Sequence, residues 1–260
     1  MEQINIDKSY LLFKKWWESI DLTNYEKSNL NKEIISFNQQ LFRLKEKQLR
    51  IGIYGKAGVG KSSILNLLLN KNEFKTDIIN GSTSNIEKKE WSLKHQSLKT
   101  IELIDSPGFD FYDIEDPENI FSQINSSEII LFTIAGDINR NEVSKIDSFI
   151  NNGKKIILVL NKIDIWNGHD LKNILQNIRL KLPKHINIPI ILNSKNNIKN
   201  QITDLLNRDG ISLLTLNSLQ LADKLFWEIK KQRLKKRQRE AQSIIGKFAT
   251  IKASGVALNP

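Results

Sequence analysis

The sequence reads Gly55-Lys56-Ala57-Gly58-Val59-Gly60-Lys61-Ser62 directly after the apolar run Leu49–Tyr54. This octapeptide satisfies the pattern GxxxxGK[ST], and the residues that follow, Ser62–Leu69, have the composition of a helix. Glycines let successive backbone N–H groups turn toward a phosphate, and the start of a helix adds its positive dipole end. The pattern therefore predicts a phosphate-binding loop for a nucleoside triphosphate, set between a strand and a helix.

Individual residues of this loop have expected roles. Lys61 is expected to act in catalysis by bridging the β- and γ-phosphates as a point charge, and the Ser62 hydroxyl is expected to ligate Mg²⁺. The residues predicted to bind the nucleotide here are Gly55, Lys56, Ala57, Gly58, Val59, Gly60, Lys61, Ser62 and Ser63.

The base is predicted by Asn161-Lys162-Ile163-Asp164, which directly follows an apolar run ending at Leu160. Asp164 offers two carboxylate oxygens that match the ring N–H and the exocyclic amine of guanine. Adenine presents an acceptor at the corresponding ring position and has no such pair of donors. We also expect the aliphatic stem of Lys162 to cover the base, and Asn161 to belong to the same site. This motif indicates a guanine nucleotide.

A third motif, Asp105-Ser106-Pro107-Gly108, follows the apolar run Thr100–Ile104. Asp105 is positioned to hold Mg²⁺ through a water molecule, and the N–H of Gly108 to sense the γ-phosphate. We therefore assign Asp105 to the metal and nucleotide site, and Gly108 to nucleotide binding and catalysis.

The chain alternates short Ile/Leu/Val-rich runs with polar stretches that suit crossover helices. This alternation predicts a three-layer α/β fold with a mostly parallel sheet buried on both faces. The more polar run Glu87–Leu93 is expected to be an antiparallel edge strand. The remaining strand candidates are Leu49–Tyr54, Thr100–Ile104, Ile129–Ala135, Lys155–Leu160 and Ile186–Leu192.

Helical segments flank this core, which divides the chain into an N-terminal extension (1–47), a nucleotide-binding domain (48–208) and a C-terminal part (209–260). Tyr10–Ile20, within the extension, and Leu213–Lys247, after the core, are expected to be helices, and we expect the flanking helices to pack on each other. A further helix is indicated by apolar residues at alternating spacings of four and three: Leu30, Ile34, Phe37, Leu41 and Leu44.

The three motifs in this order resemble those of the P-loop GTPase superfamily, and the Asp-x-Pro-Gly form is similar to its Era/TrmE-like branch. The resemblance covers residues 48–208 and implies a slow GTPase switch that uses Mg²⁺ and cycles between GTP and GDP. It further implies that Thr83 is the switch-one threonine, a catalytic and metal-binding residue, in preference to Thr76. It also implies that Ser194 and Lys195, in Asn193-Ser194-Lys195, approach the guanine oxygen.

Two positions depart from common patterns of that superfamily. Phe109 stands where Ras-like proteins have a glutamine that orients water, which a phenyl ring cannot do by hydrogen bonding. Gly58 stands where branch members activated by K⁺ have an asparagine, so we expect no K⁺ activation. Arg140 is a candidate arginine finger, with a solvated residue at a helix start as the favoured alternative.

Positive charge is concentrated near the C-terminus. The net charge is +10, and the segment Lys224–Lys252 holds ten Lys and Arg against two Glu. Seven of the ten residues in Lys230–Arg239 are basic, which indicates an anionic partner, either a lipid surface or RNA phosphates. A solvated helix face without a partner is the third interpretation.

The residues after this segment, 241–260, are small and apolar and end in Asn259-Pro260. They resemble the start of the hydrophobic Ala/Gly-rich domain of bacterial and cyanobacterial membrane-associated GTPases, which implies a truncated chain located at the inner membrane. A soluble RNA- or ribosome-associated GTPase and a GTP-gated scaffold with negligible turnover are the alternatives. The chain has no Cys, no run of about 18 uncharged apolar residues and no secretory-type start, so a cytoplasmic location is expected.

Overall fold

The computed structural model describes residues 5–76, 85–93, 97–110, 116–194 and 197–256. A six-stranded sheet lies at its centre, in the order β2-β3-β1-β4-β5-β6. Strand β2 is antiparallel to β3, and all other neighbours are parallel. The strands are β1 Gln48–Gly55, β2 Glu87–Trp91, β3 Thr100–Asp105, β4 Ile129–Ile134, β5 Lys155–Leu160 and β6 Ile190–Leu192. The expected antiparallel edge strand is confirmed.

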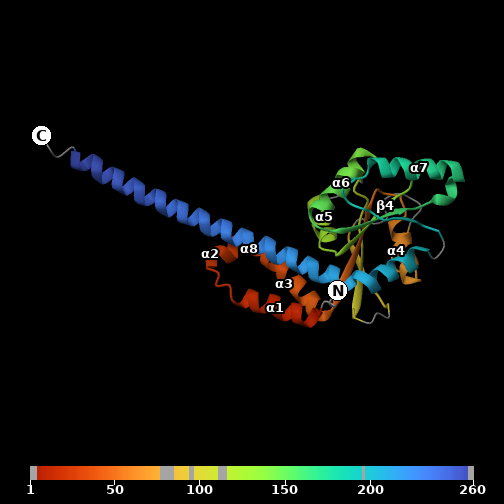
Figure 1. Ribbon diagram of the computed structural model, residues 1–260, viewed down its shortest axis with the longest axis horizontal. Helices are drawn as coiled ribbons and strands as arrows, with labels where there is room; N and C mark the ends of the chain where they lie inside the picture. Colours follow the sequence, from red (N-terminus) through yellow and green to blue (C-terminus); the bar gives the residue numbers. More distant parts are fainter. Residues whose placement is uncertain (1–4, 77–84, 94–96, 111–115, 195–196, 257–260) are drawn as a thin grey trace.

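Helices cover both faces of this sheet (Figure 1). Helix α4 and the first part of α8 pack on one face, and α5, α6 and α7 pack on the other. This arrangement confirms the predicted three-layer α/β fold. The helices are α1 Ile6–Glu18, α2 Asn24–Asn29, α3 Asn31–Glu46, α4 Lys61–Leu69, α5 Pro117–Asn125, α6 Arg140–Asn151, α7 Gly168–Lys181 and α8 Asn197–Val256, with a 3-10 turn, η1, at Ile163–Ile165.

The core follows from the alternation of side chains along buried strands. In β1, Leu49, Ile51 and Ile53 are fully buried and belong to the layer that contains α4 and α8. In β4, Ile130 and Phe132 are fully buried and belong to the layer of α5, α6 and α7. The carboxyl ends of the parallel strands therefore sit on a rigid base, where the three motifs emerge.

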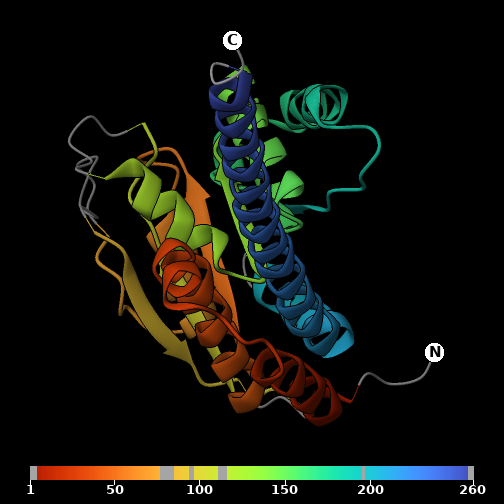
Figure 2. The same cartoon turned by 90° about the vertical axis from the view of Figure 1, so that its left-hand side faces the viewer.

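The flanking helices pack on one another as expected. Helices α1 and α3 lie along α8 in both views (Figures 1 and 2). Phe37 of α3 is buried with its ring edge-on to Trp16 and Trp17, at centroid distances of 5.5 and 5.6 Å. Leu225 and Ile229 of α8 belong to the same apolar cluster. We call α1, α2 and α3, together with the part of α8 they contact, the helical arm.

Helix α8 is longer than the sequence indicates. It begins at Asn197 rather than Leu213, so the last helix of the nucleotide-binding domain continues without interruption into the helical arm. The boundary drawn between residues 208 and 209 falls inside it. Gly210 lies within the helix where a Cβ would stand 3.0 Å from Cδ1 of Leu98, so close packing accounts for the glycine. Among the described residues, no helix is both long and apolar enough to cross a membrane.

The last strand is shorter than predicted. It covers Ile190–Leu192 and excludes the expected residues 186–189. Pro189 has no N–H to donate to a neighbouring strand. The carbonyl of Ile188 instead accepts a hydrogen bond from Nη1 of Arg179 on α7, at 2.8 Å. The strand therefore forms only after the proline.

Candidate nucleotide-binding site

The phosphate loop joins the end of β1 to the start of α4. Its backbone is left-handed at Gly58 (φ 72°) and Gly60 (φ 90°), a conformation that side chains with a Cβ rarely adopt. A Cβ on Gly60 would also stand 2.3 Å from Nδ2 of Asn161. The two glycines therefore allow a tight loop directly in front of a helix N-terminus, which is an arrangement suited to binding anions.

Lys61 is almost buried in this loop, although it is a lysine. Its Nζ donates a hydrogen bond to the carbonyl of Lys56 at 2.8 Å, which folds the side chain back over the loop. Burial lowers the pKa of Lys61 to about 8, while the nearby carboxylates of Asp105 and Asp110 act in the opposite direction. The ammonium group is therefore held close to the loop and poorly solvated, so an arriving phosphate would interact with it strongly.

Ser62 and Asp105 provide the oxygen atoms predicted to bind metal. The Ser62 hydroxyl donates to Oδ2 of Asp105 at 2.5 Å, so the two side chains converge. Burial raises the pKa of Asp105, and the hydrogen bond from Ser62 and the charge of Lys61 oppose that shift. Among the described residues, no group of three His, Cys, Asp or Glu forms a metal cage. One hydroxyl and one carboxylate fit Mg²⁺, which typically takes its remaining ligands from water and substrate phosphates.

The turn after β3 packs directly on the phosphate loop. The Ser106 hydroxyl donates to the carbonyl of Ile53 at 2.8 Å, which fixes the turn to β1. Gly108 lies so close to Ala57 that a Cβ on Gly108 would stand 2.2 Å from the Ala57 nitrogen. The glycine is therefore required for contact between the two motifs.

Phe109 points away from the phosphate loop into the apolar layer. Its ring stacks on Tyr54 at a centroid distance of 5.3 Å. Its N–H donates to the carbonyl of Gly55 at 3.3 Å, so the backbone of the turn remains against the loop. The Phe109 side chain thus fixes the turn by packing in the apolar layer, and it has no group that orients water.

The base motif begins at the end of β5, beside the phosphate loop. Asn161 donates through Nδ2 to the carbonyl of Val59 at 2.8 Å, and its Oδ1 accepts from Nδ2 of Asn193 at 2.7 Å. These bonds join the loop, the base motif and the segment after β6. Lys162 has a left-handed backbone (φ 54°) and an exposed side chain, and Asp164 is exposed in η1. The two side chains predicted to contact the base are therefore accessible.

Known proteins match the same part of the chain. Residues 50–162 match the protein family described as 50S ribosome-binding GTPase. GTPase Der of Karelsulcia muelleri is 28% identical over 205 residues, which cover 74% of this chain and 45% of Der. tRNA modification GTPase MnmE of Thermoanaerobacter sp. is 34% identical over 144 residues, 51% of this chain and 29% of MnmE. The chain thus spans less than half the length of these relatives.

A solved structure has the same fold. It is a variant of Era from Aquifex aeolicus bound to GDP and AlF₄⁻, with a TM-score of 0.52 and 24% identity over 62% of this chain and 56% of that chain. The match to the family covers the phosphate loop, the Asp105–Gly108 motif and the first two residues of the base motif, Asn161 and Lys162, and it ends before Asp164. The matched region, residues 50–162, has the motifs and the fold of the P-loop GTPases.

The remaining predicted residues of the GTPase domain lie at the edges of the site or outside the described part. Thr83 and Lys195 are outside the described residues. Ser194 follows β6, and its N–H donates to the carbonyl of Leu192 at 2.8 Å. Arg140 is exposed at the first residue of α6, and Thr76 is exposed after α4.

Two contacts of the GTPase site were not predicted from the sequence. Asp110 accepts a hydrogen bond through Oδ1 from the N–H of Ala57, at 2.7 Å. Nζ of Lys56 lies 3.4 Å from Oε1 of Glu142, a buried residue of α6 that also closes the capping box with Asn139. The only sequence signal for the contact between Asp110 and Ala57 was a carboxylate two residues after Gly108. No sequence signal indicated the contact between Lys56 and Glu142, because the two residues are far apart in the chain.

Proposed function

We propose that this GTPase domain binds GTP and GDP with Mg²⁺ and hydrolyses GTP slowly, as a molecular switch. The observation that carries the proposal is the hydrogen bond from Asn161 to Val59, which joins the guanine motif to the phosphate loop. The two motifs therefore lie within one site, and Asp164 is accessible beside it. A ligand that satisfies both has a guanine base at one end and phosphates at the other.

Each group of the site has its own role in binding the nucleotide and the metal ion. Backbone N–H groups of the loop and of the start of α4 bind phosphate oxygens, and the charge of Lys61 spans the two terminal phosphates. Ser62 would hold a Mg²⁺ ion directly, and Asp105 would hold it through water. The ion would supply positive charge that offsets the negative charge of the phosphate oxygens. The N–H of Gly108 donates a hydrogen bond to the γ-phosphate. Loss of this phosphate on hydrolysis is therefore linked to a movement of the turn after β3.

Slow turnover follows from the position of Phe109. Its ring is stacked on Tyr54, so the usual place for a water-orienting side chain is taken by a residue of the core. Intrinsic rates of GTPases without an activating partner are about 10⁻⁴ to 10⁻² s⁻¹. We expect a rate in this range in the absence of a partner.

Nucleotide binding and turnover are measured with fluorescent GDP and with single-turnover hydrolysis of GTP. We expect binding of GDP and GTP but not ATP, and slow release of phosphate that Lys61→Ala abolishes. Binding without any phosphate release would assign the protein to GTP-gated scaffolds. Equal binding of ATP and GTP would refute the proposed site.

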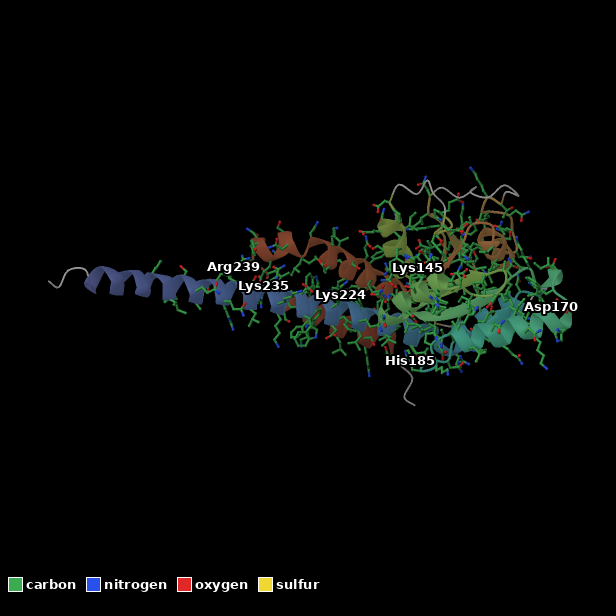
Figure 3. All side chains as sticks on the ribbon, turned by 90° about the horizontal axis from the view of Figure 1, so that it is seen from above. Lys145, Asp170, His185, Lys224, Lys235 and Arg239 are labelled. Carbon is green, nitrogen blue, oxygen red and sulfur yellow. The ribbon has the colours of Figure 1, made fainter. Side chains whose placement is uncertain are left out.

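We further propose that α8 docks on an anionic membrane surface. The basic residues of Lys230–Arg239 are exposed on the part of α8 that extends past the GTPase domain (Figure 3). One of them, Arg233, contacts α2 through Glu26 at 2.7 Å. Each basic residue near an anionic surface contributes about 1 kcal/mol at low salt.

An apolar face of α8 supports a lipid surface over RNA. At 100° per residue, this face lies opposite the side that packs on α3. Lys230 lies over the rings of Phe226 and Trp227, at 5.9 and 4.8 Å from their centroids. Interfacial helices combine such aromatic residues with flanking cations. The face consists of Leu216, Leu219, Phe226, Trp227, Leu234, Ile244 and Ile245, each 43–67% exposed.

Sedimentation with liposomes tests this part of the proposal. The chain should sediment with phosphatidylglycerol vesicles, should not do so with phosphatidylcholine vesicles, and should be released as salt rises. Trp227→Ala should weaken the binding several-fold. Tyr25→Ala, which removes an equally exposed aromatic ring on α2, should have no effect. Structure-selective RNA binding without sedimentation would refute the membrane proposal and favour an RNA partner.

A further inference from the structure

The segment after Gly108 closes onto the phosphate loop through Asp110. The carboxylate Oδ1 of Asp110 accepts the N–H of Ala57 at 2.7 Å. Two contacts hold the preceding residues in place: the Phe109 N–H donates to Gly55 at 3.3 Å, and Gly108 packs against Ala57. The stacking of Phe109 on Tyr54 anchors the same segment in the apolar layer. Asp110 therefore extends from a fixed turn to a backbone donor of the phosphate loop.

This contact uses positive groups that the nucleotide also requires. The N–H of Ala57 is a donor of the phosphate loop, and it holds a carboxylate oxygen in place of a phosphate oxygen. Asp110 also attracts the ammonium group of Lys61. A carboxylate and a phosphate are both anions, so they compete for the same donors and repel each other at short range.

The competition concerns the terminal phosphate in particular. The N–H groups expected to hold the β-phosphate are at the start of α4, whereas Asp110 binds Ala57, near the beginning of the loop. Gly108, whose N–H is expected to meet the γ-phosphate, belongs to the same turn as Asp110. A diphosphate can thus be held with the Asp110 contact in place, and a triphosphate requires the contact to open.

We propose that Asp110 is a specificity-determining residue of the switch, which favours GDP over GTP by closing the turn on the phosphate loop. The inference rests on the proposed nucleotide-binding function. We call the contact between Asp110 and Ala57 the latch. Its release costs free energy, which weakens the binding of GTP and leaves the binding of GDP unchanged. The alternative is that the hydrogen bond only shapes the turn, without competing with phosphate.

The test compares dissociation constants of GDP and of a non-hydrolysable GTP analogue, with Mg²⁺, for the full chain and three variants. Asp110→Ala removes the carboxylate, and Asp110→Asn keeps an acceptor but removes its charge. We expect both to tighten binding of the analogue, Asp110→Ala by about tenfold, the order of one charge-assisted hydrogen bond. GDP affinity should change less than about twofold. The matched control is Asp116→Asn, because Asp116 is an exposed carboxylate on the same connection and Asn caps helices equally well.

The outcomes separate the latch from the site itself. If the wild-type chain binds neither nucleotide, the proposed function fails. If the wild-type chain binds both nucleotides and the ratio of the two constants in Asp110→Ala equals the wild-type ratio, the latch is refuted and the function is retained. In that case any equal change in the two constants shows that Asp110 only shapes the loop. Thermal unfolding of each variant identifies any loss of folding.

Discussion

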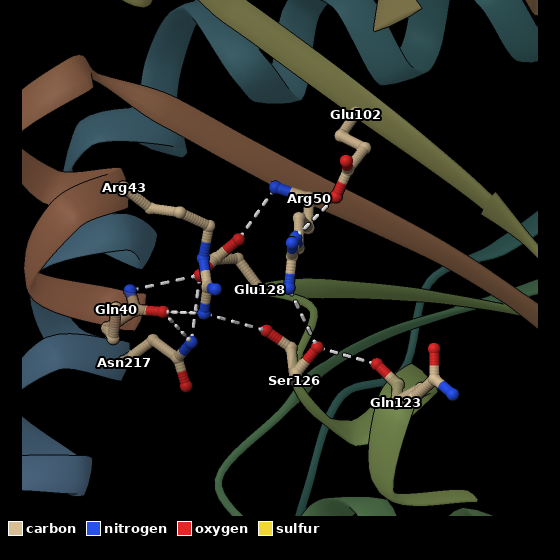
Figure 4. A network of polar contacts seen from close by, with 8 residues as sticks. All are labelled: Gln40, Arg43, Arg50, Glu102, Gln123, Ser126, Glu128 and Asn217. Carbon is tan, nitrogen blue, oxygen red and sulfur yellow. Dashed lines mark hydrogen bonds and ion pairs between the residues drawn. The ribbon is translucent and has the colours of Figure 1, made fainter. Parts of the chain in front are cut away.

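Replacing Glu128 by Gln should loosen the helical arm from the GTPase domain. Glu128 lies at the base of β4, 3% exposed, in a network between α3, α8 and the sheet (Figure 4). It accepts hydrogen bonds from Gln40 Nε2 at 3.1 Å, Asn217 Nδ2 at 2.8 Å and the Arg50 N–H at 2.7 Å. Arg43, also buried, donates to Gln40 and is attracted by Glu128.

The magnitude follows from the charges that Glu128 balances. Burial lowers the pKa of Arg43 to about 10 and that of Lys154 to about 8, and the attraction of Glu128 opposes both shifts. A neutral amide removes this attraction and also places an NH₂ group opposite the Arg50 N–H. Removing one partner of a buried charge pair typically costs about 3–5 kcal/mol. For a chain of this size the lower figure corresponds to a loss in Tm of roughly 6–12 °C.

Thermal unfolding monitored by circular dichroism measures this loss. The matched control is Glu118→Gln, which neutralises an exposed carboxylate in the first turn of α5 and should change stability by less than about 0.5 kcal/mol. Limited proteolysis should cut the arm of the Glu128→Gln variant faster than that of the wild type. If the two variants unfold at the same temperature, the network does not hold the arm in the way the contacts indicate.

Two further predictions concern the nucleotide site. The pKa of Lys61 is lowered to about 8, and phosphate binding favours the charged form, so GDP affinity should be constant below pH 8 and should fall above it, approaching tenfold per pH unit. Calorimetry in two buffers should detect proton uptake at pH 8.5, and a flat affinity profile would contradict the role of Lys61. For turnover, Phe109→Ala should leave the single-turnover rate within a few-fold of wild type, and replacing NaCl by KCl should not raise it. A large acceleration by K⁺ would show that a residue other than Gly58 supplies its ligand.

The sequence sufficed for the sheet and the phosphate loop because both depend on local patterns. Runs of branched apolar residues predict buried strands, and glycine spacing predicts the loop. It did not predict that α8 passes through Gly210, because the close approach of Leu98 comes from a distant part of the chain. The shortening of β6 was visible in principle, since Pro189 cannot donate a hydrogen bond.

The predicted site residues come together only where strands bring their ends to one edge of the sheet. Asn161 reaches the phosphate loop because β5 and β1 both pair with β4, a long-range arrangement that the motif order alone did not specify. The partners of Asp110 and Glu128 were missed for the same reason. Each is a single carboxylate whose donors are distant in sequence, 53 residues away for Asp110 and 78 to 89 residues away for Glu128. Such pairs leave no local pattern.

The most direct test of the central claim is nucleotide selectivity of the Asp164→Asn variant. Wild-type chain and variant are titrated with fluorescent GDP and XDP in the presence of Mg²⁺. We expect Asp164→Asn to weaken GDP binding by at least two orders of magnitude, because buried donors of guanine lose their acceptors. We also expect XDP to bind the variant better than GDP does, because its additional carbonyl accepts from the Asn amide. Unchanged GDP affinity in the variant, with no gain for XDP, would contradict the assignment of this site to a guanine nucleotide.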